Sequence, residues 1–172
     1  DVMDGISRIK AQLEEYAGHI RRVIVDLRPP NMEVIGLVGA LRELFLKIST
    51  SSNVHIRFRC DLENEHAIDE KVQITLYRTV QEALNNIIKH SQADAARVEL
   101  FDLDNGNIGL VVFDNGTGMP AVPRKNSPLS GTGLISIKES LELAGGTFKI
   151  ETLPGKGTTL GITCPRTGAA AR

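Results

Sequence analysis

The sequence predicts an α/β sandwich, in which helices pack on a mixed, largely antiparallel sheet. Asn105-Gly106 lies between two apolar runs, which is a strong signal for a β-hairpin. Two further strand-like segments, 148–153 and 158–164, flank a Pro-Gly-Lys-Gly turn. Helical patterns precede and separate these hairpins, and this order favours a mixed sheet over a doubly wound parallel one.

The first element is a long helix over residues 1–28. Its apolar side chains recur in steps of three and four from Ile6 to Leu27, which is a heptad seam. Such a seam favours a partner helix; the alternative is an amphipathic helix that packs on its own domain. Pro29-Pro30 ends the helix, because proline lacks the backbone N–H and disfavours helix in the residue before it.

The elements of the main domain follow in order. Three-to-four periodicity marks its helices and side-chain alternation marks its strands. We expect Asn31 and Asp69 to be N-caps and Gly145-Gly146 to end the last helix. The expected elements are a helix at 32–50, a strand at 54–60, a helix from 69 to about 91, strands at 97–103 and 108–113, a helix at 134–144, and strands at 148–153 and 158–164.

Length and composition indicate one domain with an appendage. The chain has 172 residues, of which 41% are apolar and 24% charged, and a formal net charge of −1. This charge gives no reason to expect nucleic acid or an acidic membrane as a partner. Cys60 and Cys164 stand alone in strand-like segments, so we expect small buried residues and not a metal site.

The domain boundaries follow from these patterns. We expect a dimerisation-type helix at 1–28, a main domain at 29–166 and an unstructured tail at 167–172. Because the helical pattern is already running at Asp1, we expect a fragment of a longer protein. No apolar run approaches the ~20 residues that span a bilayer, so a cytoplasmic fragment is expected, whose parent protein can still be anchored in a membrane.

Four polar side chains share one face of the long central helix. At ~100° per residue, Glu82, Asn86, Lys89 and His90 fall within an arc of ~100° beside the apolar stripe. An amide oxygen suits Mg²⁺, which shares its ligands with water and substrate phosphates. Lys89 can offset phosphate charge, and Glu82 can hold a metal-bound water or act as a base. The alternative is a solvated polar face near a helix end.

Two glycine-containing blocks follow. Asp114 ends an apolar strand, where its carboxylate can accept a hydrogen bond from the exocyclic amine of adenine; Gly116 and Gly118 allow close approach and positive φ. The alternative is a simple turn. The second block, Gly131-Thr132-Gly133-Leu134, precedes a helix whose N-terminal amides can bind phosphate, or it only begins that helix. Arg124 and Lys125 between the blocks either contact phosphate or are solvated charges.

In combination, the three blocks resemble the N box and glycine boxes of the GHKL superfamily, which includes gyrase, a class of heat-shock chaperones, sensor histidine kinases and MutL. Residues 81–93 are similar to kinases that serve LuxR-type response regulators, and 20–30 resemble the end of their second dimerisation helix. The resemblance covers residues 6–166. It implies a Bergerat ATP-binding fold that takes ATP and Mg²⁺.

The resemblance also implies a role for each matching residue. The implied roles are Asn86 on Mg²⁺ with Glu82 nearby, Lys89 and His90 toward phosphate, Asp114 on adenine, and Thr158 near the adenine and its bound water. Gly116, Gly118, Gly131 and Gly133 would frame a lid, and Thr132 and Leu134 of the same block are expected to bind ATP. The family's phosphoacceptor block has no match in this chain. His19 stands in the second helix, so we do not assign that role to it.

The function that this resemblance implies is the ATP-binding catalytic domain of a two-component histidine kinase. The γ-phosphoryl group would pass to a histidine outside this chain and on to a LuxR-type regulator, in a homodimer formed through a helical hairpin of the parent protein. One alternative is a serine kinase of the anti-sigma type, which needs no heptad helix. Another is a non-catalytic module that senses nucleotide or dimerises.

Overall fold

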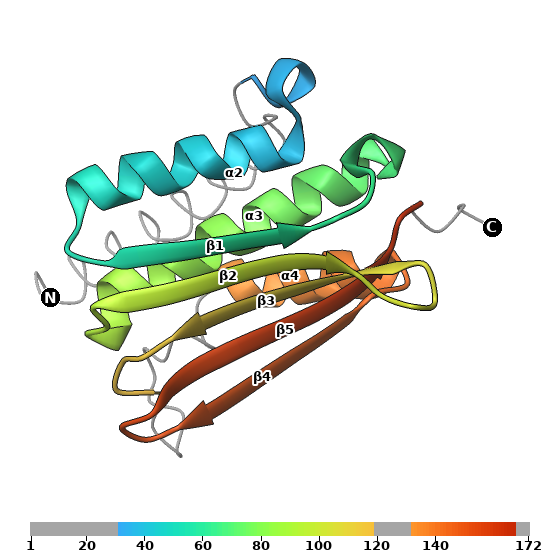
Figure 1. The fold of residues 1–172 in the computed structure, drawn as a ribbon. Helices are drawn as coiled ribbons and strands as arrows, with labels where there is room; N and C mark the ends of the chain where they lie inside the picture. Colours follow the sequence, from blue (N-terminus) through green and yellow to red (C-terminus); the bar gives the residue numbers. More distant parts are fainter. Residues whose placement is uncertain (1–30, 119–131, 168–172) are drawn as a thin grey trace, which may run out of the picture. The chain divides into compact units, whose positions relative to one another are not determined.

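The computed structural model describes residues 31–118 and 132–167, all of which belong to one compact unit. The expected helix at 1–28, Arg124 and Lys125 in the segment 119–131, and residues 168–172 lie outside the described residues. The elements are α2 (Met32–Ser51), β1 (His55–Asp61), the 3₁₀ turn η1 (Glu65–Ala67), α3 (Glu70–Asn86), the π-helical turn η2 (Ile87–Ser91), β2 (Ala95–Asp102), β3 (Asn107–Asp114), α4 (Thr132–Leu143), β4 (Thr147–Leu153) and β5 (Gly157–Pro165) (Figure 1).

The strands form one sheet in the order β1-β2-β3-β5-β4. β1 pairs with β2 in parallel, and the other three pairs are antiparallel, so the prediction of a mixed, largely antiparallel sheet is confirmed. The three α-helices lie on one face of this sheet (Figure 1). Both predicted hairpins are present, with boundaries that lie within two residues of the expected ones.

The core lies between α3 and the sheet. The predicted apolar stripe is buried along its whole length, and it comprises Val72, Leu76, Val80, Ala83 and Leu84 of α3 and Ile87 of η2. Alternate side chains of β2 and β3 meet it, among them Val98, Leu100, Leu110 and Val112. The apolar side chains that recur with period 3.6 on the helix therefore pack on those that recur with period 2 on the strands. This packing fixes α3 above the end of β3 that carries Asp114.

Helix α2 contains a break that the sequence pattern did not predict. Asn31 holds the N-cap position, but it has φ of 67°, and its side chain makes no capping hydrogen bond to the described part of the helix. Gly36 has φ of 70° and ψ of −179° and interrupts the helix. The Glu65 carboxylate in η1 accepts a hydrogen bond of 2.9 Å from the Val38 N–H just beyond the break. The cap therefore comes from 27 residues away and not from Asn31.

Replacing Glu65 by alanine is expected to destabilise the fold. The Val38 N–H would lose a charged acceptor at a helix start, at a cost of about 1–2 kcal/mol. Urea unfolding followed by circular dichroism measures this change. Glu63→Ala is the control, because the Glu63 side chain is exposed and two residues away. Equal midpoints for the two variants would contradict the role of Glu65 as a cap.

The central helix begins as predicted and ends differently. Asp69 is its N-cap and accepts a 2.9 Å hydrogen bond from the Lys71 N–H. The α-helix stops at Asn86, and the chain continues as the wider η2 turn before Gln92 adopts φ of 56°. The assumed rotation of ~100° per residue therefore fails after Asn86, because a π-turn rotates less per residue.

The cysteines are free thiols in different strands. Cys164 is buried, and burial raises its pKa to about 11, so it is an unreactive core residue at neutral pH. Cys60 is only partly buried. Among the described helices, none combines the length and apolar character required to cross a bilayer.

Candidate functional site

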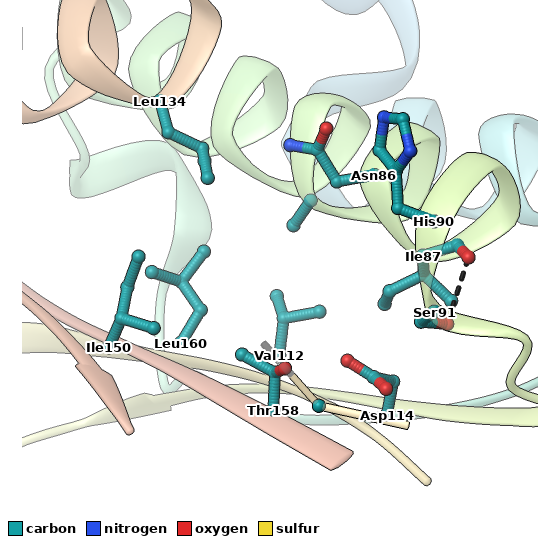
Figure 2. A pocket seen from close by; sticks show the side chains of 12 residues that line it. Asn86, Ile87, His90, Ser91, Val112, Asp114, Leu134, Ile150, Thr158 and Leu160 are labelled. Carbon is teal, nitrogen blue, oxygen red and sulfur yellow. Dashed lines mark hydrogen bonds between the residues drawn. The ribbon is translucent and has the colours of Figure 1, made fainter. Parts of the chain in front are cut away.

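A pocket lies between the end of α3, the start of α4 and the sheet. Its space amounts to about 520 Å³, including a part open to solvent. Asp114 and Thr158 rise from the strands on one side, and Asn86 and His90 extend from the helix on the other (Figure 2). Apolar side chains line the space between them. Residues of all three predicted blocks thus line one cavity.

Asp114 occupies the end of β3 and is only 4% exposed. Strand pairing fixes its place, because it lies opposite Ala96 of β2 and Thr158 of β5. Its Oδ1 accepts a 2.8 Å hydrogen bond from the Gly116 N–H. The carboxylate is therefore held at a strand end by two neighbouring strands and by its own loop, and it lines the pocket.

Burial raises the pKa of the Asp114 carboxyl above its ordinary value, and hydrogen bonds from the Gly116 and Thr158 backbones oppose that rise. The folded protein thus holds this proton more tightly than the unfolded chain does. Ionised Asp114 consequently lowers stability at neutral pH, and this loss fades as the pH falls through the raised pKa. A buried carboxylate kept at such a cost is typical of a functional acceptor.

Glycines bring the backbone close around this carboxylate. A Cβ on Gly116 would lie 2.2 Å from the Ser91 carbonyl oxygen, and one on Gly118 would lie 2.4 Å from the Leu153 carbonyl oxygen. Gly118 has φ of +70°, as predicted, whereas Gly116 is not among the described glycines of positive φ. Gly157, which the sequence marks only as part of a turn, would place a Cβ 1.8 Å from the Asp114 carbonyl oxygen.

Only some residues of the predicted polar face of α3 line the pocket. The Asn86 amide N–H donates to the Glu82 carboxylate at 3.4 Å, which leaves the amide oxygen available to another ligand. Asn86 and His90 line the pocket, but Glu82 and Lys89 do not. Lys89 is exposed. Glu82 therefore reaches the pocket only through its hydrogen bond to Asn86.

The structure describes only part of the third predicted block, residues 131–134. Leu134 is buried in the first turn of α4 and lines the pocket. Thr132 and Gly133 are the residues that begin α4, while Gly131 lies outside the described residues. Thr158 also lines the pocket, and its hydroxyl lies 3.3 Å from the Thr152 hydroxyl across the β4–β5 pair. The start of α4 and the start of β5 thus close two sides of the site.

Most of the apolar wall of the pocket is not marked by any motif in the sequence. The additional lining residues are Ala83, Ile87, Ser91, Val112, Ile150 and Leu160. Ala83 and Ile87 belong to the buried apolar stripe, and a helical stripe gives no sign of where a cavity opens. The alternation in β3, β4 and β5 could have identified Val112, Ile150 and Leu160, because they share the sheet face of the core.

The lining fits an adenine nucleotide. A flat apolar ring can occupy the space among Val112, Ile150 and Leu160, with the Asp114 carboxylate as acceptor for an amine at its edge. The glycine backbones admit close approach, since a Cβ would fill that space. The Asn86 amide oxygen suits a hard cation that shares its other ligands with phosphate and water. No group of three His, Cys, Asp or Glu side chains that could hold a metal occurs in residues 31–118 and 132–167.

Comparisons with known proteins agree with this geometry. Residues 71–168 match the family of histidine kinase-, DNA gyrase B- and HSP90-like ATPases, which is more than half of the chain. The oxygen sensor histidine kinase NreB of Staphylococcus carnosus is 30% identical over 168 residues, which cover 97% of this chain and 47% of that protein. The histidine-protein kinase/phosphatase DegS of Brevibacillus brevis is 30% identical over 167 residues, which cover 97% and 42%.

The fold is shared with a solved structure as well. The histidine kinase domain of a blue-light activated histidine kinase from Erythrobacter litoralis superposes with a TM-score of 0.62 at 16% identity, over 78% of this chain and 68% of that one. At this identity the likeness concerns the fold alone. The chain spans less than half the length of the two curated relatives above.

Proposed function

The chain belongs to the family of histidine kinase-, DNA gyrase B- and HSP90-like ATPases, and from this premise we propose that it is the ATP-binding catalytic portion of a two-component sensor histidine kinase. It binds Mg-ATP and transfers the γ-phosphoryl group to a histidine that lies outside this chain. The observation that carries the proposal is the buried Asp114 carboxylate, which faces a pocket whose other side presents Asn86 and His90.

The base end of the site selects adenine. Asp114 accepts a hydrogen bond from the exocyclic amine, and Thr158 supports the same edge of the ring. Guanine presents no amine at that position, so the carboxylate also gives specificity. Gly116 and Gly118 let the loop approach the base, and Val112, Ile150 and Leu160 exclude water from its faces.

The phosphate end of the site positions the reacting group. Asn86 offers its amide oxygen to Mg²⁺, and Glu82 orients Asn86 through their hydrogen bond. Bound Mg²⁺ would supply neutralisation of phosphate charge. Lys89, His90 and the chain from Gly131 to Leu134 contact the phosphates. Catalysis in this scheme is mostly positioning and electrostatic stabilisation.

The chain divides into three parts in this proposal. Residues 1–28 contribute one helix of a dimerisation hairpin, residues 29–166 form the catalytic domain, and residues 167–172 form a tail. The partner is a response regulator, as the relatives named as histidine kinases suggest, and the sequence resemblance points to the LuxR type. The catalytic portion itself works in the cytoplasm.

Phosphotransfer in trans tests the proposal. The chain is incubated with γ-labelled ATP, Mg²⁺ and a separately produced helical hairpin that carries the acceptor histidine of a related kinase. Label is expected on the acceptor, and Asn86→Ala should reduce the rate about 100-fold, since it removes a group that acts on the transferring phosphoryl. Gln81→Ala is the control, because Gln81 is exposed on the same helix.

The outcomes separate the alternatives. Nucleotide binding without any transfer to histidine would favour the non-catalytic module. Transfer of label to a serine would favour the anti-sigma type of kinase. Equal rates for Asn86→Ala and Gln81→Ala would overturn the role of Asn86.

A further inference from the structure

The η2 turn joins the two halves of the proposed nucleotide site, and Ser91 is its last residue. Ser91 is 9% exposed and lines the pocket. Asn86 directly precedes the turn and His90 lies within it. Single π-turns are rare, because they cost stability relative to an α-turn. Where they do occur, they are frequently found at functional sites. The local bonds that keep this turn open therefore need an explanation.

The Ser91 side chain holds the turn. Its hydroxyl donates a 2.8 Å hydrogen bond to the Ile87 carbonyl oxygen, which lies at the start of the turn. The Ser91 Oγ in turn accepts a 3.1 Å hydrogen bond from the Ala93 N–H. One hydroxyl thus spans the turn and connects it to the segment that leads into β2.

The Ser91 backbone holds the loop that follows Asp114. Its carbonyl oxygen accepts a 2.7 Å hydrogen bond from the Thr117 N–H and a 3.3 Å hydrogen bond from the Thr117 hydroxyl. The absence of a side chain at Gly116 permits this contact, since a Cβ there would lie 2.2 Å from the same oxygen. Ser91 therefore contacts the phosphate-facing turn with its side chain and the base-binding loop with its backbone.

We propose that Ser91 is a positioning residue that fixes the separation between the Asp114 carboxylate and the phosphate-facing side chains Asn86 and His90. The inference rests on the proposed function, since it assigns adenine to one end of the pocket and phosphate to the other. A ligand that contacts both ends needs this separation to be fixed. A ligand that contacts only the Asp114 end does not.

Paired titrations of adenosine and Mg-ADP against the full chain test this role. Ser91→Ala is expected to weaken Mg-ADP about fivefold, the equivalent of one net hydrogen bond, and to leave adenosine unchanged. Thr117→Val removes the 3.3 Å hydrogen bond from the Thr117 hydroxyl to the Ser91 carbonyl oxygen. This variant should weaken Mg-ADP binding about twofold, again without an effect on adenosine. Ser140→Ala is the matched control, because the Ser140 hydroxyl donates at the same 2.8 Å to the carbonyl four residues earlier, but in α4 on the surface.

Hydrogen exchange supplies a readout that needs no nucleotide. In Ser91→Ala, the Thr117 and Ala93 amides should exchange several-fold faster, while amides of β2 and β3 keep their wild-type rates. Equal weakening of adenosine and Mg-ADP, or no weakening of either, would overturn the positioning role. If the wild-type chain bound neither ligand, the proposed function would be wrong. In that case, unchanged exchange of the Thr117 amide in Ser91→Ala would also show that Ser91 does not hold the loop after Asp114. Should Ser91→Ala not fold, Thr117→Val carries the same test.

Discussion

The Asp114→Asn variant is expected to bind ADP about 100-fold more weakly than the wild-type chain, because a buried charged acceptor is replaced by a group that must turn an N–H₂ toward the adenine amine. The amide keeps an oxygen for the Gly116 N–H, which donates to Asp114 Oδ1 at 2.8 Å. The fold should therefore survive. Its thermal midpoint should equal or exceed that of the wild type, since burial raises the pKa of Asp114 and ionised Asp114 costs stability at neutral pH.

Isothermal titration and calorimetric melting of both proteins measure these two effects. The pH dependence of ADP binding gives a check on the same group. Wild-type affinity should fall as the pH drops through the raised pKa of Asp114, which lies above the ~3.9 of an ordinary aspartate, and the variant should show no such step. A variant that melts lower and still binds ADP normally would contradict the assignment of Asp114 to the base.

The Gly116→Ala variant is expected to lose both stability and nucleotide binding. The new Cβ would lie 2.2 Å from the Ser91 carbonyl oxygen and 2.8 Å from Asp114 Oδ1, so the backbone of the loop must move. Overpacking of this kind costs about 1–3 kcal/mol, and ADP affinity should fall more than tenfold because the carboxylate moves with the loop. Chemical denaturation and ADP titration report the two losses.

Gly161→Ala is the matched control for this substitution. Gly161 lies within β5, and no described heavy atom comes within 4 Å of a Cβ built there. Neither glycine is among those of positive φ, so backbone strain does not separate the two cases. The control should retain ADP binding and gain up to about 1 kcal/mol from the lower entropy of the unfolded chain. Comparable losses in both variants would show that the Gly116 contact has no special role.

Much of the site was predictable because local patterns fix its framework. Asp114 ends a strand whose alternation and hairpin are plain in the sequence, and this pairing sets it opposite Thr158. Asn86 is the last residue of α3, so the helical period of ~100° per residue still places it correctly beside the apolar stripe. The base end and the first turn of the phosphate end therefore follow from periodicity and turn chemistry.

The remaining features depend on contacts between distant segments. The π-turn is held by Ser91, whose carbonyl is engaged by Thr117, 26 residues later in the chain. Gly36 breaks α2, and the cap comes from Glu65 in another segment. Gly157 reads as part of a turn, and its close approach to Asp114 exists only once β3 and β5 pair. A sequence pattern describes neighbours along one element, so such contacts are not visible in it.

Comparative titration of the chain with ADP and GDP, each with and without Mg²⁺, tests the central claim most directly. The proposed site predicts one ADP per chain, tighter binding in the presence of Mg²⁺, and at least about tenfold weaker binding of GDP, since guanine offers no amine to Asp114. Equal affinities for ADP and GDP, or no binding of ADP under any condition, would contradict an adenine-nucleotide site in this pocket.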